Sequence, residues 1–242
     1  MINKISVITV VYNGRQDIQS TIESVANQDY PHIEFIVVDG GSSDGTVDIL
    51  SSNNNVIDKW ISEKDKGIYD AMNKGVKLAT GDYVIFMNAG DLFFTPNAVS
   101  KCISTLCSSD VLYGNHWVIG ARRVNGLQTA KAIEHLNKGM VCSHQSMFFR
   151  RSTLIDNPFS FDYGSAGDYE LICRLYSKGF EFNRVDEVIA YYQAGGVSDV
   201  KRVKSLLFSL KAGSEHLPLN WKDYAYYTYR VLREIIVGIF YK

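Results

Sequence analysis

The chain has 242 residues, of which 46% are hydrophobic and 21% charged, a balance typical of globular rather than disordered proteins. Its 25 Lys and Arg nearly equal its 26 Asp and Glu, so the overall charge gives no reason to expect a nucleic-acid partner. The four cysteines form no CxxC pair, which argues against a zinc site or a disulfide framework. No segment has the roughly 18 apolar residues of a spanning helix and the N-terminus lacks signal-peptide features, so we expect a cytoplasmic protein.

Short apolar runs alternate with helix-type patterns through the first hundred residues. Residues 5–12, 33–39 and 83–87 read as buried strands, and residues 18–26 and 68–79 have the 3/4 spacing of amphipathic helices. This alternation predicts βαβ units and an α/β fold with a mostly parallel sheet covered on both faces. Ligands collect at the carboxyl ends of such strands, so we expect the functional residues at that edge.

The second hundred residues follow a less regular pattern. A helix is expected to begin at Thr95-Pro96, and two apolar runs around Asn125-Gly126 predict an antiparallel pair. Further on, the sequence predicts a strand in "HQSMFFRR", a helix over 168–179 and a strand over 182–193. We expect residues 1–200 to form one compact domain built around a mixed sheet.

The last residues, 201–242, have a different character. From Asn220 onward, aromatic residues alternate with Arg230, Arg233 and Lys242 in one amphipathic helical pattern. Such a helix can lie at a membrane surface, or it can pack on the domain or on a second subunit. The sequence leaves these alternatives open.

The stretch "VVDGGSSDGT" places Asp39 at a strand end, followed by flexible Gly and Ser residues. A carboxylate there can accept from an N–H donor such as the imide of uracil, but the same pattern also occurs in plain turns. The glycines at 40, 41 and 45 do not match the dinucleotide fingerprint, and the P-loop lysine is missing. A nicotinamide enzyme or an ATPase is therefore less favoured.

Two further loops carry charged residues at predicted strand ends. Lys66 precedes a helix on which Asp70 and Asn73 share a face, an arrangement that favours a phosphate site over a solvated charged surface. Asp91 follows the strand at 83–87 and either caps a turn or holds a metal ion. One carboxylate is enough to tether Mg²⁺ or Mn²⁺ when a substrate phosphate supplies other ligands.

Six segments in order resemble a family 2 glycosyltransferase of the GT-A type, similar to enzymes that build bacterial exopolysaccharide and O-antigen units; they are "ISVITVVYNG", "IEFIVVDGGSSDGT", "GIYDAMNKGVKLATGDYVIFMNAGD", "HQSMFFRR", "GDYEL" and "GGVS". The resemblance covers residues 4–200. It implies a GT-A, Rossmann-like mixed sheet, with a nucleotide-sugar-binding half in 1–100 and an acceptor and catalytic half in 101–200. Residues 201–242 form a helical extension outside it.

The resemblance also implies roles for individual residues. The nucleotide-sugar contacts fall on Thr9, Tyr12 and Asp39 for the base, and on Lys66, Asp70 and Asn73 for the ribose or diphosphate. The metal-binding Asp-x-Asp motif falls on residues 88–91, where Asp91 is the carboxylate that remains and Asn88 stands in for the earlier acid.

The catalytic base of the family corresponds to Asp168, although its usual acidic neighbour is Gly167 here. Asp168 can also serve as the N-cap of the helix that follows. His144, Gln145 and Ser198 are possible contacts of the acceptor or a phosphate, and a structural hydrogen bond is the commoner role of a lone histidine.

The sequence thus predicts an inverting, Mn²⁺- or Mg²⁺-dependent transferase. It would move a sugar from a nucleoside-diphosphate donor, preferably a UDP-sugar, to a glycan acceptor on a polyprenyl lipid. We expect it to act in exopolysaccharide or lipopolysaccharide synthesis at the inner face of the cytoplasmic membrane. Two alternatives remain: a sugar-nucleotide-binding module without turnover, suggested by the two altered motifs, and a nucleotidyltransferase, to which "VVYNGRQD" is a poor fit.

Overall fold

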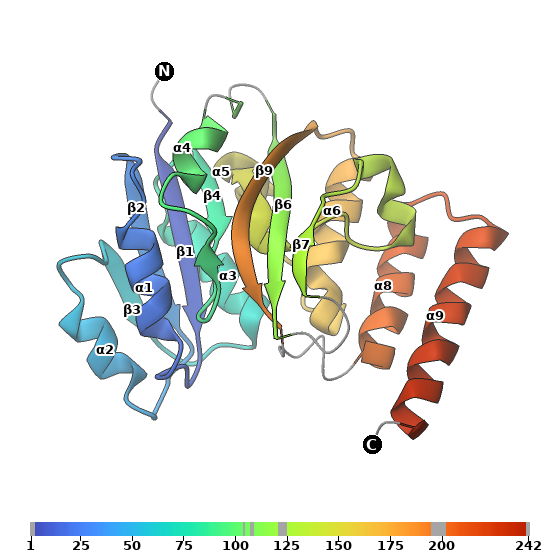
Figure 1. Ribbon diagram of the computed structural model, residues 1–242, viewed down its shortest axis with the longest axis horizontal. Coiled ribbons are helices and arrows are strands. Elements are labelled where there is room, and N and C mark those ends of the chain that lie inside the picture. The colour runs from blue at the N-terminus through green and yellow to red at the C-terminus, as the bar shows by residue number, and fades with distance from the viewer. Residues whose placement is uncertain (1–2, 104, 107–108, 121–124, 195–201, 241–242) are drawn as a thin grey trace.

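A computed structural model of the chain describes residues 3–103, 105–106, 109–120, 125–194 and 202–240. Within these residues one mixed sheet of nine strands runs in the order β3-β2-β1-β4-β8-β6-β9-β5, with β7 paired to β6 (Figure 1). The predicted α/β class and mostly parallel sheet are confirmed.

The parallel half of the sheet consists of β1 (Ile5–Val11), β2 (Ile33–Asp39), β3 (Lys59–Ser62) and β4 (Tyr83–Phe86). In the other half, β6 (Val111–Ile119) and β9 (Phe182–Gln193) run parallel to each other. Three strands run antiparallel to their neighbours: β5 (Leu92–Phe93), β7 (Gly126–Gln128) and β8 (Met147–Arg150). The predicted antiparallel pair is therefore β6 and β7.

Helices cover both faces of the sheet. Alternate side chains of β1 and β2 point to opposite faces, so these strands contribute to a core on each side. One core, which includes Val7 and Val37, lies against α1 (Ile18–Ala26), α2 (Thr46–Ser52) and α4 (Ala98–Ile103). The other includes Ile8 and Ile36, and lies against α3 (Ile68–Leu78), α5 (Arg151–Asp156) and α6 (Gly167–Ser177). The continuous apolar runs of the sequence are thus strands buried on both faces.

The C-terminal residues form two helices, α8 (Arg202–His216) and α9 (Trp221–Phe240), at the end of the molecule beyond α6 (Figure 1). Ala212 and Leu217 are buried in the same core as α6. The helix predicted from residue 220 is confirmed, whereas α8 was not resolved as a separate helix by the sequence pattern. None of the described helices is both long and apolar enough to cross a membrane.

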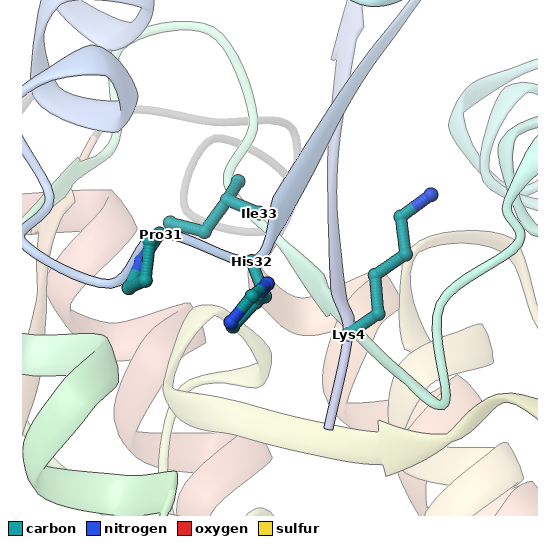
Figure 2. A pocket seen from close by; sticks show the side chains of 4 residues that line it. All are labelled: Lys4, Pro31, His32 and Ile33. Atoms are coloured by element: carbon teal, nitrogen blue, oxygen red, sulfur yellow. The ribbon is translucent and has the colours of Figure 1, made fainter. Parts of the chain in front are cut away.

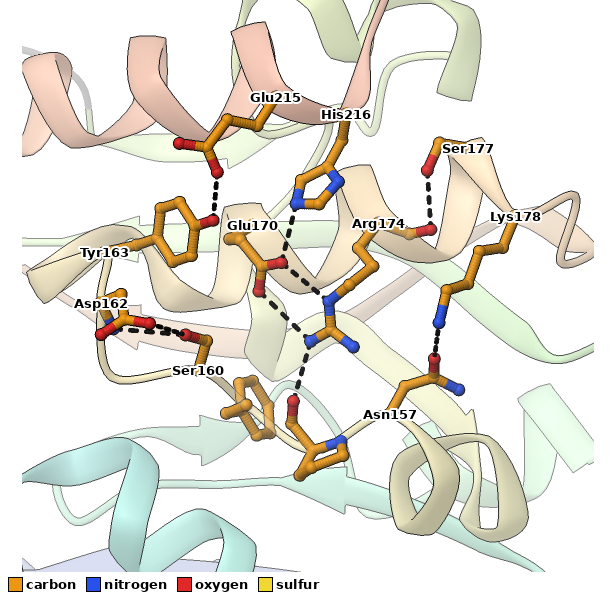
Figure 3. A network of polar contacts seen from close by, with 12 residues as sticks. Asn157, Ser160, Asp162, Tyr163, Glu170, Arg174, Ser177, Lys178, Glu215 and His216 are labelled. Atoms are coloured by element: carbon orange, nitrogen blue, oxygen red, sulfur yellow. Dashed lines mark hydrogen bonds and ion pairs between the residues drawn. The ribbon is translucent and has the colours of Figure 1, made fainter.

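A polar cluster joins α6 to α8 (Figure 3). Glu170 of α6 is 2% exposed, and its carboxylate accepts from Arg174 Nε at 2.7 Å and Nη2 at 3.2 Å. His216, the last residue of α8, places Nε2 2.9 Å from the same carboxylate. Nearby, the Tyr163 hydroxyl donates to Glu215. The contacts of His216 and Glu215 hold α8 against α6 and the segment before it.

Replacing Glu170 with Ala is expected to lower the free energy of unfolding by about 3 kcal/mol, because it leaves the partly buried Arg174 without its buried partner. Urea unfolding of the variant measures the loss. The control is Glu187→Ala, which removes a pair with Lys101 whose side chains are 46% and 40% exposed. Exposed pairs contribute at most about 1 kcal/mol, so equal losses in the two variants would contradict the assigned role.

Candidate functional site

Sheet topology brings three separate segments together at the carboxyl edge of β4. Strand β8 is antiparallel to β4, with Ile85 opposite Phe148, so the short helix η2 (His144–Ser146) before β8 lies beside the turn that follows β4. Strand β9 is antiparallel to β5, with Leu92 opposite Tyr191, which brings Gln193 to the same turn. That turn contains Asn88 and Asp91.

The carboxylate of Asp91 is buried, at 5% exposed. Its Oδ2 accepts from Gln145 Nε2 at 2.7 Å, and its Oδ1 accepts from the backbone N–H of Gln193 at 3.0 Å. Burial raises the pKa of Asp91 to about 6, and the two hydrogen bonds and His144 oppose that rise only in part. A carboxylate held in this way has a strong tendency to gain a proton or a cation.

Asn88 supplies a second oxygen on the same turn. Its Nδ2 lies 3.1 Å from His144 Nε2, whereas its Oδ1 is buried and has no hydrogen-bond partner among the described residues. An orphaned buried oxygen near Asp91 fits a cation or a ligand hydroxyl. The described residues contain no cluster of three or more His, Cys, Asp or Glu side chains, so a cation here would take its other ligands from substrate and water.

His144 connects Asn88 to Asp168. Its Nδ1 lies 3.3 Å from Asp168 Oδ2. Since the amide of Asn88 can donate to Nε2, the proton of a neutral imidazole belongs on Nδ1, from which it donates to Asp168. His144 was predicted as a contact of acceptor or phosphate, and the structure gives it this bridging position.

Asp168 lies in the first turn of α6 and has three donors. Besides His144, the Tyr69 hydroxyl donates to Oδ1 at 3.2 Å and the Tyr169 backbone N–H at 2.8 Å. Burial raises the pKa of Asp168, but His144 and the other donors outweigh it, so the pKa lies below the ordinary value. The N-cap alternative is wrong, because Ala166 occupies the N-cap position.

The glycine at 167 has a physical explanation in Tyr69. A Cβ at Gly167 would lie 2.7 Å from Tyr69 Cε2 and 3.0 Å from the Ser160 carbonyl oxygen. The Tyr69 ring stacks on Phe159, with centroids 5.4 Å apart, so it cannot easily move away. The space that the resemblance assigns to an acidic side chain is thus filled by the ring whose hydroxyl reaches Asp168.

Gly167→Ala is therefore expected to lower the free energy of unfolding by about 1–3 kcal/mol through overpacking. In a Tyr69→Leu background the same change should cost clearly less, because the flat ring that it meets is gone. A double-mutant cycle measured by chemical denaturation tests this coupling. Additive effects of the two substitutions would show that Gly167 is not there to accommodate Tyr69.

The loops after β1, β2 and β3 meet around Gly40. A Cβ on Gly40 would lie 2.5 Å from Asp65 Oδ2 and 3.3 Å from Tyr12 Cδ2, so only glycine fits there without a shift. Tyr12 is 68% exposed and presents an open aromatic ring at this edge. The predicted base contact Tyr12 is thus accessible to a ligand.

Asp39 faces inward in this structure. Its fully buried carboxylate accepts from the backbone N–H groups of Gly41 and Ser42 at 3.1 and 2.9 Å, from the Ser62 hydroxyl at 2.6 Å, and from the Ser42 hydroxyl. Oδ2 takes three of these bonds and Oδ1 one, which leaves acceptor capacity on Oδ1. Asp39 therefore organises the loop, and its contact with a base remains a prediction.

The other predicted contact residues fall into two groups, one exposed at the carboxyl edge of the sheet and one inside the protein. Lys66 is exposed at the start of α3, and its backbone N–H donates to Asp70 Oδ2 at 3.0 Å. Thr9 is fully buried and donates to the Met87 carbonyl at 2.6 Å, and both ends of the Asn73 amide bind the backbone of Phe159 at 2.9 Å. Thr9 and Asn73 thus bind backbone groups within the protein and stabilise the segments beside the site. Ser198 lies outside the described residues.

Sequence reasoning missed Tyr69 and Gln193. Tyr69 is buried on the apolar face of α3 and reads as an ordinary core residue. Gln193 acts through its backbone N–H, which any residue except proline supplies, so no residue type signals it.

A shallow hollow lined by Lys4, Pro31, His32 and Ile33 lies elsewhere, before β1 and at the start of β2 (Figure 2). This is the opposite end of these strands from Asp39. It contains no residue of the candidate site.

A match to a family model and matches to individual proteins both indicate a glycosyltransferase. Residues 6–163 match Glycosyl transferase family 2. The chain is 35% identical over 177 residues to a glycosyltransferase of Mycobacterium tuberculosis, Rv1514c, which covers 70% of this chain and 68% of the relative. It is 30% identical over 224 residues to the PGL/p-HBAD biosynthesis glycosyltransferase of Mycobacterium bovis, with 86% of each chain covered.

Solved structures share the fold at lower identity. TarS of S. aureus in complex with UDP-GlcNAc has a TM-score of 0.71 and 20% identity, over 90% of this chain and 68% of that one. The mannosyltransferase PcManGT of Pyrobaculum calidifontis, in complex with GDP-Man and Mn²⁺, has a TM-score of 0.68 and 18% identity, over 89% and 64%. Both have GT-A-like folds.

Proposed function

Because the chain belongs to glycosyl transferase family 2 and is a nucleotide-sugar-dependent glycosyltransferase, we propose that it transfers a sugar with inversion at the carboxyl edge of β4, with Asp168 as the catalytic base. The observation that carries this proposal is the lowered pKa of the Asp168 carboxyl. Donors from His144 and Tyr69 keep its pKa low, so it is an ionised acceptor of protons at neutral pH.

The chemistry is a single displacement. The oxygen of an acceptor hydroxyl attacks the anomeric carbon, the bond from that carbon to the diphosphate oxygen breaks, and Asp168 takes the hydroxyl proton. One displacement inverts the anomeric configuration. His144 and Tyr69 hold the carboxylate in place for the incoming hydroxyl.

Asp91 and the Oδ1 of Asn88 are the groups that would hold Mn²⁺ or Mg²⁺. When bound, such an ion neutralises the charge of a departing nucleoside diphosphate. Gln145 and the backbone of Gln193 orient the Asp91 carboxylate for this purpose. The relative PcManGT, which has the same fold, was solved with Mn²⁺ and GDP-Man.

A UDP-sugar is the preferred donor. In this proposal the base lies against the exposed ring of Tyr12, with Asp39 accepting from its N–H, and the diphosphate lies near Lys66 and the N-terminus of α3. The solved complex of TarS with UDP-GlcNAc supports this choice of donor class.

The acceptor is a glycan carried on a polyprenyl lipid, in the synthesis of a bacterial surface polysaccharide such as exopolysaccharide or lipopolysaccharide. This assignment rests on the resemblance of the motifs to enzymes of those pathways. It places the reaction at the inner face of the cytoplasmic membrane. A non-catalytic binding module is less well supported, since Asn88 and Tyr69 occupy the places of the two missing acids.

The test is release of nucleoside diphosphate from UDP-, dTDP- and GDP-sugars, each with Mn²⁺ or a chelator, with and without a polyprenyl-diphosphate sugar. We expect metal-dependent release from a UDP-sugar that increases when the lipid acceptor is added. Turnover of a dTDP- or GDP-sugar instead would overturn the assignment of uracil as the nucleobase of the donor. Tight binding of a donor without any turnover, even with lipid acceptors, would favour the binding module.

A further inference from the structure

Helix α9 is anchored to the protein through its polar residues. Asp223 is 2% exposed and accepts from Asn137 Nδ2 at 2.7 Å. Tyr227 is fully buried and donates to the Tyr169 hydroxyl at 3.1 Å. Glu234 is 8% exposed and lies 3.5 Å from Arg202 Nε. Acidic and hydroxyl groups thus line the face of α9 that contacts the domain.

The opposite face of α9 is apolar and open to solvent. Its exposed large side chains recur at helical spacing along about 22 Å of the helix. We call these residues the outer face of α9: Trp221, Tyr224, Tyr229, Leu232, Ile235 and Ile236, between 44% and 75% exposed. A surface helix normally buries its apolar face and exposes its polar one, and α9 does the reverse. The outer face is therefore suited to a partner that removes it from water.

Charge indicates what kind of partner this is. Residues 201–242 contain eight Lys and Arg against three Asp and Glu, whereas the other 200 residues contain 17 against 23. On the helical wheel, Lys222 and Arg233 border the outer face beside Tyr229. The apolar stripe thus has a basic margin, in a chain that is otherwise acidic.

We infer that the outer face of α9 binds the surface of a lipid bilayer that contains anionic lipids. Leu232, Ile235 and Ile236 enter the acyl region, the aromatic rings occupy the headgroup level, and Lys222 and Arg233 meet lipid phosphates. A second copy of this chain would bring one basic margin against another, so it fits this face less well. The stripe runs along the helix, so α9 lies parallel to the membrane plane.

Flotation of the purified full-length protein with vesicles tests this inference. Vesicles of phosphatidylcholine alone are compared with equimolar phosphatidylcholine and phosphatidylglycerol. We expect flotation with the anionic vesicles, and weaker binding as salt is raised. Leu232→Glu should reduce partitioning at least about tenfold, because it removes an apolar side chain that the bilayer would bury and adds a charge of the wrong sign. Lys222→Gln combined with Arg233→Gln should remove most of the salt dependence.

The matched control is Ile155→Glu. Ile155 of α5 is 43% exposed, close to the 44% of Ile235, but it lies outside the outer face. This variant should float like the wild type, and thermal unfolding of each variant verifies that it is folded. No flotation of the wild type, or flotation that Leu232→Glu leaves unchanged, would overturn the inference. A dimer that Leu232→Glu dissociates, in a protein that does not bind vesicles, would assign the face to a second copy. Because the readout is binding, it is independent of whether any donor is turned over.

Discussion

Replacing Asp168 with Asn is expected to lower kcat roughly 10²–10⁴-fold, the contribution typical of a general base. The amide cannot take a proton, and its NH₂ group would face the donors that the carboxylate now accepts from, His144 and Tyr69. Binding of the donor should change little, since Asp168 acts on the acceptor. Steady-state rates, with the dissociation constant of the nucleotide measured separately, distinguish these effects.

Asp162→Asn is the control for this prediction. Asp162 is an exposed carboxylate in the loop just before α6, so it matches the change in charge without touching the site. It should leave kcat near the wild-type value. A similar loss in both variants, or none in Asp168→Asn, would remove Asp168 from the proposed chemistry.

Asp91 should make the stability of the metal-free protein depend on pH. Its pKa is raised in the folded state to about 6, so the folded protein binds the proton more tightly than the unfolded chain does. Its contribution to stability is thus fully present below about pH 4 and is lost as the pH rises through about 6. Between about pH 4 and pH 8, the free energy of unfolding of Asp91→Asn should gain about 2–3 kcal/mol relative to wild type.

Bound metal should stabilise the wild type relative to Asp91→Asn at high pH, the opposite of the effect expected for the metal-free protein. Mn²⁺ together with a nucleoside diphosphate is expected to raise the melting temperature of the wild type at about pH 8, where Asp91 is ionised, and much less at about pH 5, where Asp91 carries a proton. Asp91→Asn should lose most of this increase at both pH values. The exposed Asp48→Asn serves as the control. An increase in melting temperature that Asp91→Asn retains would mean that the ion binds elsewhere.

Strands β1, β2 and β4 of the parallel half could be predicted from the sequence because each is a largely apolar run that ends in a polar loop. That pattern directly reports burial on both faces, and the positions of Tyr12, Asp39 and Asp91 at strand ends follow from it. The orientation of a side chain at a strand end does not follow. Asp39 and Thr9 have the residue types of ligand contacts, but hydrogen bonds within the protein occupy the Thr9 hydroxyl and most of the Asp39 carboxylate.

The proximity of His144 and Gln145 to the Asn88–Asp91 turn could not be predicted from local patterns. It depends on β8 entering the sheet antiparallel between β4 and β6, a matter of long-range pairing that no segment of sequence carries alone. Tyr69 was missed for a related reason. Its helix position predicts burial, and only the packing of α6 against α3 reveals that its hydroxyl reaches Asp168.

The pairing of β9 with β5 also sets when the site can form during synthesis. Asp91 receives a hydrogen bond from Gln193, 102 positions later in the chain, and Tyr69 meets Asp168 across 99 positions. Contacts between such distant residues form late, because the long intervening chain must first be closed. A nascent chain on the ribosome can therefore build the parallel half of the sheet early, but it can assemble the complete site only after β9 has emerged.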